Sequence, residues 1–138
     1  MSVDESVRQY VRQRANNRCE YCRLSQDVGA VFRFHIEHVR PRQHGGDDNL
    51  ENLALTCPNC NWAKGPNLSA IDPVDDIMVP LFNPRKDAWQ EHFVLVDLHI
   101  EDRTPRGRAT VGLLRLNAAN RLEIRDQLAP HGKLDRRK

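Results

Sequence analysis

The sequence predicts an α+β fold, in which a first part at residues 1–66 precedes a small C-terminal α/β extension at residues 67–138. Helical and strand patterns alternate along the chain, and two C-x-x-C pairs fall in the first part. Hydrophobic residues make up 39% of the 138 residues and aromatic residues 6%, so we expect a modest apolar core. A bound metal commonly reinforces a core of that size.

The first part reads as helix, strand, loop, strand and short helix. Residues 2–17 carry apolar side chains at helical spacing, and Ser2 with Glu5 forms a capping box. Residues 31–39 alternate as a strand does. Its expected buried face consists of Phe32, Phe34 and Ile36. A Pro- and Gly-containing loop, a return strand and a helix follow at residues 40–48, 53–57 and 58–64.

The extension carries weaker patterns. Residues 83–93 predict a helix capped by Asn83, residues 93–100 a strand, and residues 118–128 a helix behind an Asn117 cap. Two segments, residues 109–116 and 131–138, read as an ambiguous element and an unstructured tail. The apolar side chains expected to form a satellite core against the first part are Trp89, Phe93, Val94, Val96 and Leu98.

Cys19, Cys22, Cys57 and Cys60 are the only cysteines of the chain. Four thiolates are a ligand set of structural Zn²⁺, and each C-x-x-C turn can present two sulfurs to one ion. A redox role would explain one pair but not both. The 34 residues between the pairs exceed the usual spacing of a zinc ribbon, so we expect the enclosed segment to hold the chemistry.

The enclosed segment and the second cysteine pair contain "EHVRP", "HGG", "NLAL" and "CNWAKG" in that order. Together with the cysteine pairs, these motifs resemble the HNH endonuclease family over roughly residues 15–66. The resemblance implies a ββα-metal (HNH, His-Me finger) nuclease core stapled by structural zinc. The segments at residues 79–93 and 104–117 are similar to the C-terminal extension of one group of small bacterial HNH proteins.

The resemblance also implies a role for each motif residue. His38 would be the general base, and Glu37 and Asn61 would be ligands of a catalytic divalent metal. Asn52 would orient His38 and tether it across the loop, while the four cysteines would be structural. The chain departs from the family at Glu37, where Asp is more usual.

These residue types suit phosphodiester hydrolysis on physical grounds. A neutral imidazole has a pKa near ~6.5 and can take a proton from water near neutral pH. A carboxylate and an amide oxygen suit Mg²⁺ or Mn²⁺ and leave most coordination sites open for water and phosphate oxygens. Glu37 and His38 are neighbours, and they can reach one phosphate only at the end of the strand, which is where they lie.

Several other polar side chains flank the motif or cluster at a turn in the extension. A phosphate contact and a solvated or hydrogen-bonded structural role are both compatible with them. The candidate nucleic-acid contacts are His35, Arg40, Arg42, His44, Lys64, Arg103, Arg106 and Arg108. We expect Trp62, on the motif helix, to pack in the interior.

Charge is divided unevenly along the chain. Residues 1–66 carry a net charge of +1, residues 67–102 carry −6 and residues 103–138 carry +7. The basic third can follow a polyanion, and we hypothesise that the C-terminal extension at residues 67–138 sets substrate preference. Solvated faces that neutralise each other in the fold would account for the same distribution.

The leading hypothesis is a metal-dependent DNA endonuclease that nicks as a monomer and cuts both strands as a homodimer. The alternatives are a non-catalytic zinc-stabilised nucleic-acid-binding module, an inert subunit of a restriction, repair or packaging assembly, and a toxin nuclease. No apolar run of signal-peptide or membrane-spanning type is present, so we expect a cytoplasmic protein whose partner is nucleic acid and not a membrane.

Overall fold

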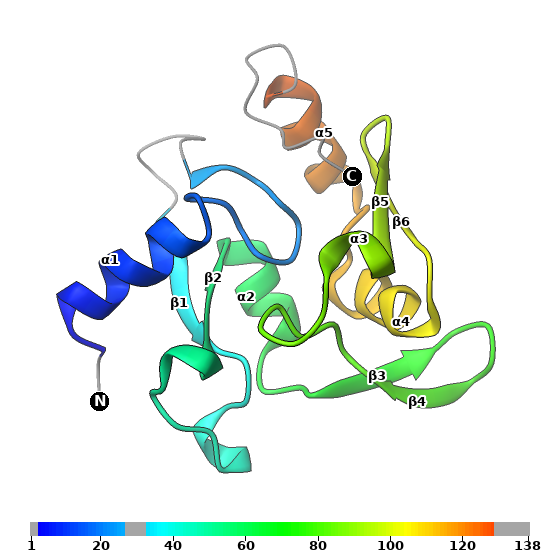
Figure 1. The fold of residues 1–138 in the computed structure, drawn as a ribbon. Helices are drawn as coiled ribbons and strands as arrows, with labels where there is room; N and C mark the ends of the chain where they lie inside the picture. Colours follow the sequence, from blue (N-terminus) through cyan, green and yellow to red (C-terminus); the bar gives the residue numbers. More distant parts are fainter. Residues whose placement is uncertain (1–2, 27–32, 129–138) are drawn as a thin grey trace.

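The structure is a computed structural model, and it describes residues 3–26 and 33–128 (Figure 1). The elements in chain order are α1 (Glu5–Arg14), β1 (His35–His38), β2 (Leu53–Thr56), α2 (Pro58–Lys64), β3 (Ser69–Asp72), β4 (Ile77–Pro80), α3 (Trp89–His92), β5 (Phe93–Val96), β6 (His99–Asp102), α4 (Pro105–Leu114) and α5 (Ala119–Leu128). Within the described residues the strands form three antiparallel hairpins, β1–β2, β3–β4 and β5–β6. This mixture of helices and hairpins confirms the predicted α+β class.

Helix α1 begins three residues later than the sequence predicts. The Asp4 carboxylate accepts the Val7 N–H at 3.1 Å and thereby caps the helix. Ser2, the predicted cap, lies outside the described residues. Val11 is fully buried, and Arg14 donates to the Leu53 carbonyl at 2.7 Å, which ties the end of α1 to β2.

The next three elements form the predicted ββα unit. Strand β1 pairs with β2 so that Glu37 lies opposite Ala54. Cys57 caps α2, Pro58 occupies its first turn, and Gly65 ends it with a positive φ of 51°. The strand is shorter than predicted and begins at His35. Phe34, just before it, is buried as expected, whereas Ile36 is half-buried and Phe32 lies outside the described residues.

One hydrophobic cluster joins the two parts of the chain. Trp89, predicted for a satellite core, donates its indole N–H to the Tyr21 carbonyl at 2.8 Å. The buried residues of the cluster are Val11, Cys19, Tyr21, Cys22, Phe34, Leu53, Leu55, Cys57, Cys60, Phe82, Trp89, Phe93, Ile100, Leu114 and Leu116. The side chains of Trp89 and Phe93 therefore fill the same core as those of the first part.

The predicted helix over residues 83–93 is wrong in its extent. Asn83 does cap a turn, since its side-chain oxygen accepts the Arg85 N–H at 2.8 Å. That turn stops at Asp87, whose side chain folds back to accept the Asn83 N–H at 2.9 Å. Helix α3 then begins at Trp89.

The predicted strand over residues 93–100 is a hairpin instead. Val96 pairs with His99, so Asp97 and Leu98 form a two-residue turn, and Asp97 adopts a φ of 54°. Aspartate tolerates this left-handed conformation, which short hairpin turns require. The prediction missed this turn because apolar residues recur at every second position from Val94 to Ile100, as they would in one continuous strand.

The final segments resolve into two helices. The ambiguous residues 109–116 fall largely in α4, which Thr104 caps by accepting the Gly107 N–H at 3.0 Å. Asn117 does not cap α5 as predicted. Its amide instead pairs with the backbone N–H and carbonyl of Ile100, both at 2.8 Å, which joins the start of α5 to β6. The predicted tail over residues 131–138 lies outside the described residues.

The hairpin β3–β4 has no counterpart among the sequence predictions. Its inner edge packs on α4 through Asp72, which is fully buried and binds Arg108. In Figure 1 α2 lies in the middle, with α1 and the β1–β2 hairpin on one side and the β3–β4 hairpin and α4 on the other, while α5 lies at the top. None of the helices in the described part of the chain is long and apolar enough to cross a membrane.

Candidate active site and zinc centre

The four cysteine sulfurs gather in one buried cluster beside the start of α2. Their Sγ atoms all lie within 4.8 Å of one another, and those of Cys22 and Cys57 are 3.7 Å apart. A tetrahedral zinc ion with Zn–S bonds of about 2.3 Å holds its sulfurs ~3.8 Å apart. The cysteines are free of disulfides. The cluster therefore fits the structural zinc ion that the sequence predicts.

Backbone turns at each pair aim the sulfurs inward. The Cys22 N–H donates to Cys19 Sγ at 3.5 Å, and the Cys60 N–H donates to Cys57 Sγ at 3.4 Å. Burial raises the pKa of Cys19 and of Cys60, whereas hydrogen bonds from the three other thiols lower the pKa of Cys22. Because zinc binds the thiolate, loading of this cluster with the ion would release protons from the buried thiols.

Glu37 points into the interior, where it is 8% exposed. Its Oε2 accepts the Tyr21 hydroxyl at 3.0 Å, and its Oε1 lies 3.6 Å from Lys64 Nζ with no hydrogen-bond partner among the described residues. Burial raises the pKa of Glu37 to about 7, although Lys64 and Tyr21 act to lower it. A buried carboxylate oxygen without a donor is a place that a cation can fill.

His38 is oriented by a residue that the sequence analysis missed. Its Nε2 lies 2.6 Å from Asp48 Oδ1, and the pKa of Asp48 is lowered by this hydrogen bond and by Arg42. An ionised carboxylate can only accept, so Nε2 carries the proton and Nδ1 of the neutral ring is left as the proton acceptor. An acidic pair directly after two glycines, at Asp47 and Asp48, was the available signal.

Asn52 closes the loop between the two strands. Its Oδ1 accepts the Arg40 N–H at 2.8 Å, and its Nδ2 donates to the carbonyls of Arg40 at 3.0 Å and Asp47 at 2.7 Å. A Cβ on Gly46 would lie 1.6 Å from the Arg40 carbonyl oxygen, so the loop needs glycine there. Asn52 thus tethers the loop that carries Asp48, and Asp48 contacts the ring of His38.

Asn61 and Lys64 lie three residues apart on one face of α2. Lys64, a candidate nucleic-acid contact, is 2% exposed and donates to the Val39 carbonyl at 3.1 Å. Its ammonium is engaged inside the protein, and contact with a phosphate stays a prediction. Asn61 is half-buried, and its side chain has no hydrogen bond to another described residue. Its amide oxygen and the Glu37 carboxylate fit a hard divalent cation.

The other predicted contacts of the first part lie around the loop. His35, Arg40 and His44 are exposed, and Arg40 Nε donates to the His44 carbonyl. Arg42 donates to Asp48 at 2.6 Å, which places it in one chain of contacts with His38. Nucleic-acid contact by these side chains stays a prediction.

Two of the three arginines predicted to grip phosphates hold carboxylates instead. Arg106 donates to both oxygens of Asp87 at 2.9 and 2.8 Å. Arg108 forms a bidentate pair with Asp72 at 2.7 Å for each bond, while Arg103 is exposed. The acidic middle and the basic end of the chain therefore neutralise each other in part.

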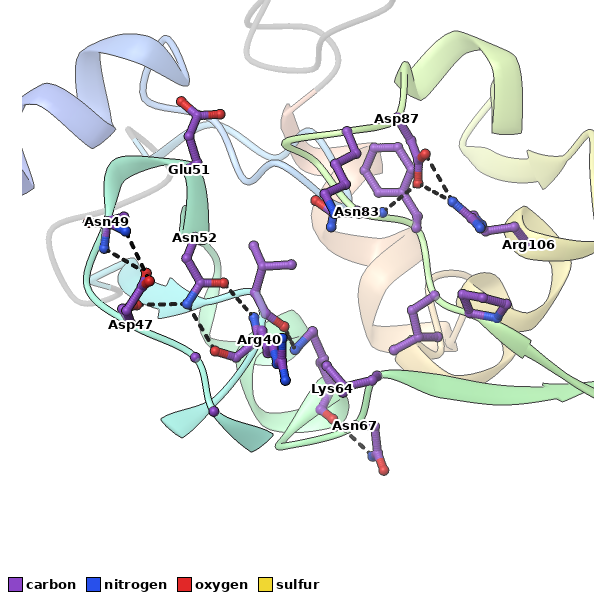
Figure 2. A pocket seen from close by; sticks show the side chains of 18 residues that line it. Arg40, Asp47, Asn49, Glu51, Asn52, Lys64, Asn67, Asn83, Asp87 and Arg106 are labelled. Carbon is purple, nitrogen blue, oxygen red and sulfur yellow. Dashed lines mark hydrogen bonds and ion pairs between the residues drawn. The ribbon is translucent and has the colours of Figure 1, made fainter. Parts of the chain in front are cut away.

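A groove of about 510 Å³ separates the loop of the first part from residues 80–87 (Figure 2). Asn52, Arg40 and Lys64 lie on one side of it, and Asn83, Asp87 and Arg106 lie on the other. His38 and Glu37 do not line it. The groove thus borders the loop closed by Asn52 and not the candidate base itself.

The prediction that Trp62 packs in the interior is wrong. It lies on α2 next to Asn61, and it is 88% exposed. The inward face of this short helix is taken by Cys57, Cys60 and Lys64, which leaves Trp62 on the opposite face.

Comparison with known proteins bears on the same segment. Residues 19–67 match the family model described as HNH endonuclease. The chain is 28% identical over 110 residues to the Septu protein PtuB of Bacillus thuringiensis, an alignment that covers 78% of this chain and 40% of that protein. The chain therefore spans about two fifths of the length of this curated relative. No solved structure matches the chain. Residues 19–67, which hold the four-cysteine cluster and the ββα unit, thus match an HNH endonuclease domain.

Proposed function

We propose that this chain is a metal-dependent endonuclease that hydrolyses phosphodiester bonds of DNA. The observation that carries the proposal is the His38–Asp48 contact of 2.6 Å. The imidazole that this contact fixes directly follows Glu37, a carboxylate with one oxygen that accepts no hydrogen bond from a described residue. A module that only binds nucleic acid has no need of a fixed proton acceptor. The family of residues 19–67 supports nuclease chemistry at the level of the family.

Each residue of the candidate site has a separate role in the proposed hydrolysis. Nδ1 of His38 takes the proton from the attacking water, while Asp48 holds the ring and stabilises the imidazolium that forms. Asn52 keeps the loop closed, so the ring and the carboxylate hold their positions as the proton moves. Glu37 and Asn61 would hold Mg²⁺ or Mn²⁺ through oxygen ligands. When bound, that cation neutralises charge on the phosphate and assists the leaving oxygen.

The proposal includes the number of strands cut. One ββα unit has one general base, so a monomer cuts one strand in each encounter. A double-strand break then needs a second copy of the chain or two successive nicks. Localisation in the cytoplasm, where thiols stay reduced, suits the zinc centre.

The test is a supercoiled-plasmid assay with Mg²⁺, Mn²⁺ or EDTA, run on the wild type, His38→Ala and His99→Ala. His99 is exposed on β6 and belongs to none of the candidate contacts, so His99→Ala is the control. We expect metal-dependent open circles from the wild type and the control, and none from His38→Ala. Plasmid binding without cleavage under either metal would favour the binding module or the inert subunit. Equal cleavage by wild type and His38→Ala would remove His38 as the base.

A further inference from the structure

Helix α5 brings a buried arginine to the cysteine cluster from far along the chain. Arg121 is 5% exposed and lies outside the segment that matches the HNH family. Its Nη1 lies 3.4 Å from Cys60 Sγ and 3.7 Å from Cys57 Sγ, and its Nη2 lies 3.3 Å from Cys60 Sγ. These distances are those of N–H···S hydrogen bonds, and they involve both cysteines of the second pair.

Among the described residues, Arg121 has no counter-charge other than these sulfurs. Its remaining contact is a hydrogen bond from Nη2 to the Leu114 carbonyl at 2.7 Å. No carboxylate of the described residues forms an ion pair with it, whereas Arg106 and Arg108 each hold an aspartate. A buried guanidinium is costly to leave uncompensated, so the thiolates are its electrostatic partner.

A zinc ion bound to the four cysteines would in turn leave a negative charge that a nearby cation can offset. Four thiolates exceed the charge of one zinc ion by two negative charges, and the cluster is closed to water. A guanidinium in direct contact offsets part of this excess and directs its N–H groups at the sulfur lone pairs.

We propose that Arg121 is a positioning residue of the zinc centre, which neutralises and orients the thiolates of Cys57 and Cys60 and thereby couples the docking of α5 to metal binding. The C-terminal helix then does more than cover the core. It closes the outer shell of a metal site whose four ligands all come from the first part of the chain.

Arg125 provides the matched control. It lies one turn further along α5, is 2% exposed, and donates to the carbonyls of Leu98 at 2.9 Å and Leu116 at 2.5 Å instead of to sulfur. Loss of either arginine weakens the docking of α5. Loss of Arg121 alone removes hydrogen bonds from the thiolates.

The first measurement is the sulfur-to-metal charge-transfer band of the full chain loaded with Co²⁺. A positive group that bonds to a thiolate lowers the energy of the sulfur electrons. We therefore expect the band to move to longer wavelength in Arg121→Gln, with a smaller change in Arg121→Lys and none in Arg125→Gln. The second measurement is the rate of zinc transfer to a chromogenic chelator, which we expect to rise about tenfold or more in Arg121→Gln.

The outcomes are decisive in both directions. An unmoved band in both Arg121 variants would overturn the proposal. An equal rise in zinc transfer in Arg121→Gln and Arg125→Gln would also overturn it, because α5 would then act through docking alone. If Arg121→Gln does not fold, Arg121→Lys keeps the charge and still reports on the lost geometry. Neither measurement depends on nuclease activity.

Discussion

His38 Nε2 and Asp48 Oδ1 lie 2.6 Å apart, across the loop that joins the two strands of the ββα unit. Asp48 also binds Arg42 at 2.6 Å, so one carboxylate ties the candidate base to the loop. This contact fixes which ring nitrogen can accept a proton, and it is the first relationship to test.

Asp48→Asn should lower the rate of plasmid nicking by roughly 10²-fold, within the range that general-base catalysis contributes. The amide carries no charge, so it can no longer stabilise the imidazolium that forms in the reaction. The carboxylate of Asp48 is ionised in the wild type because its pKa is lowered below the ordinary carboxyl value. Asp47→Asn is the control, since its carboxylate only holds Asn49. Full activity in Asp48→Asn would show that the contact does not orient the base.

Asn52→Ala should destabilise the loop, because three hydrogen bonds are lost and the backbone groups of Arg40 and Asp47 lose their partners. At about 1 kcal/mol for each bond, we expect the free energy of unfolding to fall by about 2–3 kcal/mol. Urea denaturation measures this, with Asn49→Ala as the comparison. Native stability combined with lost nicking would instead assign Asn52 a direct role in the reaction.

Lys64→Met should be strongly destabilising although methionine fills the space. It leaves the buried Glu37 carboxylate without its cation and the Val39 carbonyl without its donor, a change worth about 3 kcal/mol. Lys86→Met removes an exposed lysine and should leave stability within about 0.5 kcal/mol of the wild type. Adding Glu37→Gln to Lys64→Met should recover part of the loss. If Lys64→Met and Lys86→Met were equally stable, Lys64 would have to lie at the surface.

The two tryptophans make a direct pair of tests. Trp89→Ala should cost about 3–5 kcal/mol of unfolding free energy, because the side chain is 4% exposed and bonds to Tyr21. Trp62→Ala should change stability by less than about 0.5 kcal/mol, because its side chain is 88% exposed. Thermal or urea unfolding separates the two. A marked loss in Trp62→Ala would restore the expectation that it packs.

The Asp72–Arg108 pair should contribute to stability in a pH-dependent way. Arg108 lowers the pKa of Asp72 to about 2 through two hydrogen bonds. A lowered pKa means that the contribution is complete above the ordinary carboxyl pKa of about 4 and is lost as the pH falls toward 2. Asp72→Asn should therefore lower Tm at pH 7. Asp75→Asn, whose carboxylate is half exposed and lies 3.9 Å from Arg108, should lower it much less.

A deletion of residues 103–138 would not isolate a substrate-binding role for the basic third. The deletion removes the buried Leu114 and Leu116, together with Arg121, which contacts the cysteine cluster. It therefore tests folding first. Single substitutions at the exposed Arg103, which no described carboxylate holds, address nucleic-acid affinity without that complication.

The sequence by itself determined the parts of the protein that depend on local pattern. The spacing of the cysteines predicts the four-sulfur cluster, since each pair needs only its own turn to aim two sulfurs. The strand, loop, strand and helix between and beside the pairs followed from alternation, from Pro58 and from Gly65. Prediction failed where a strand pattern and a turn signal overlapped. At Asp97, the apolar residues on both sides indicated one strand, although the aspartate begins a turn.

Only the tertiary structure decided which polar groups meet. The burial of Glu37 beside Tyr21 and Lys64, the hold of Asp48 on His38, and the contact of Arg121 with sulfur join residues 10 to 64 positions apart in the chain. Such contacts leave no periodic trace, because each side chain follows the local rules of its own helix, strand or loop. Their pairing depends on how those elements pack, and the cost of burying an unpaired charge then selects the partners.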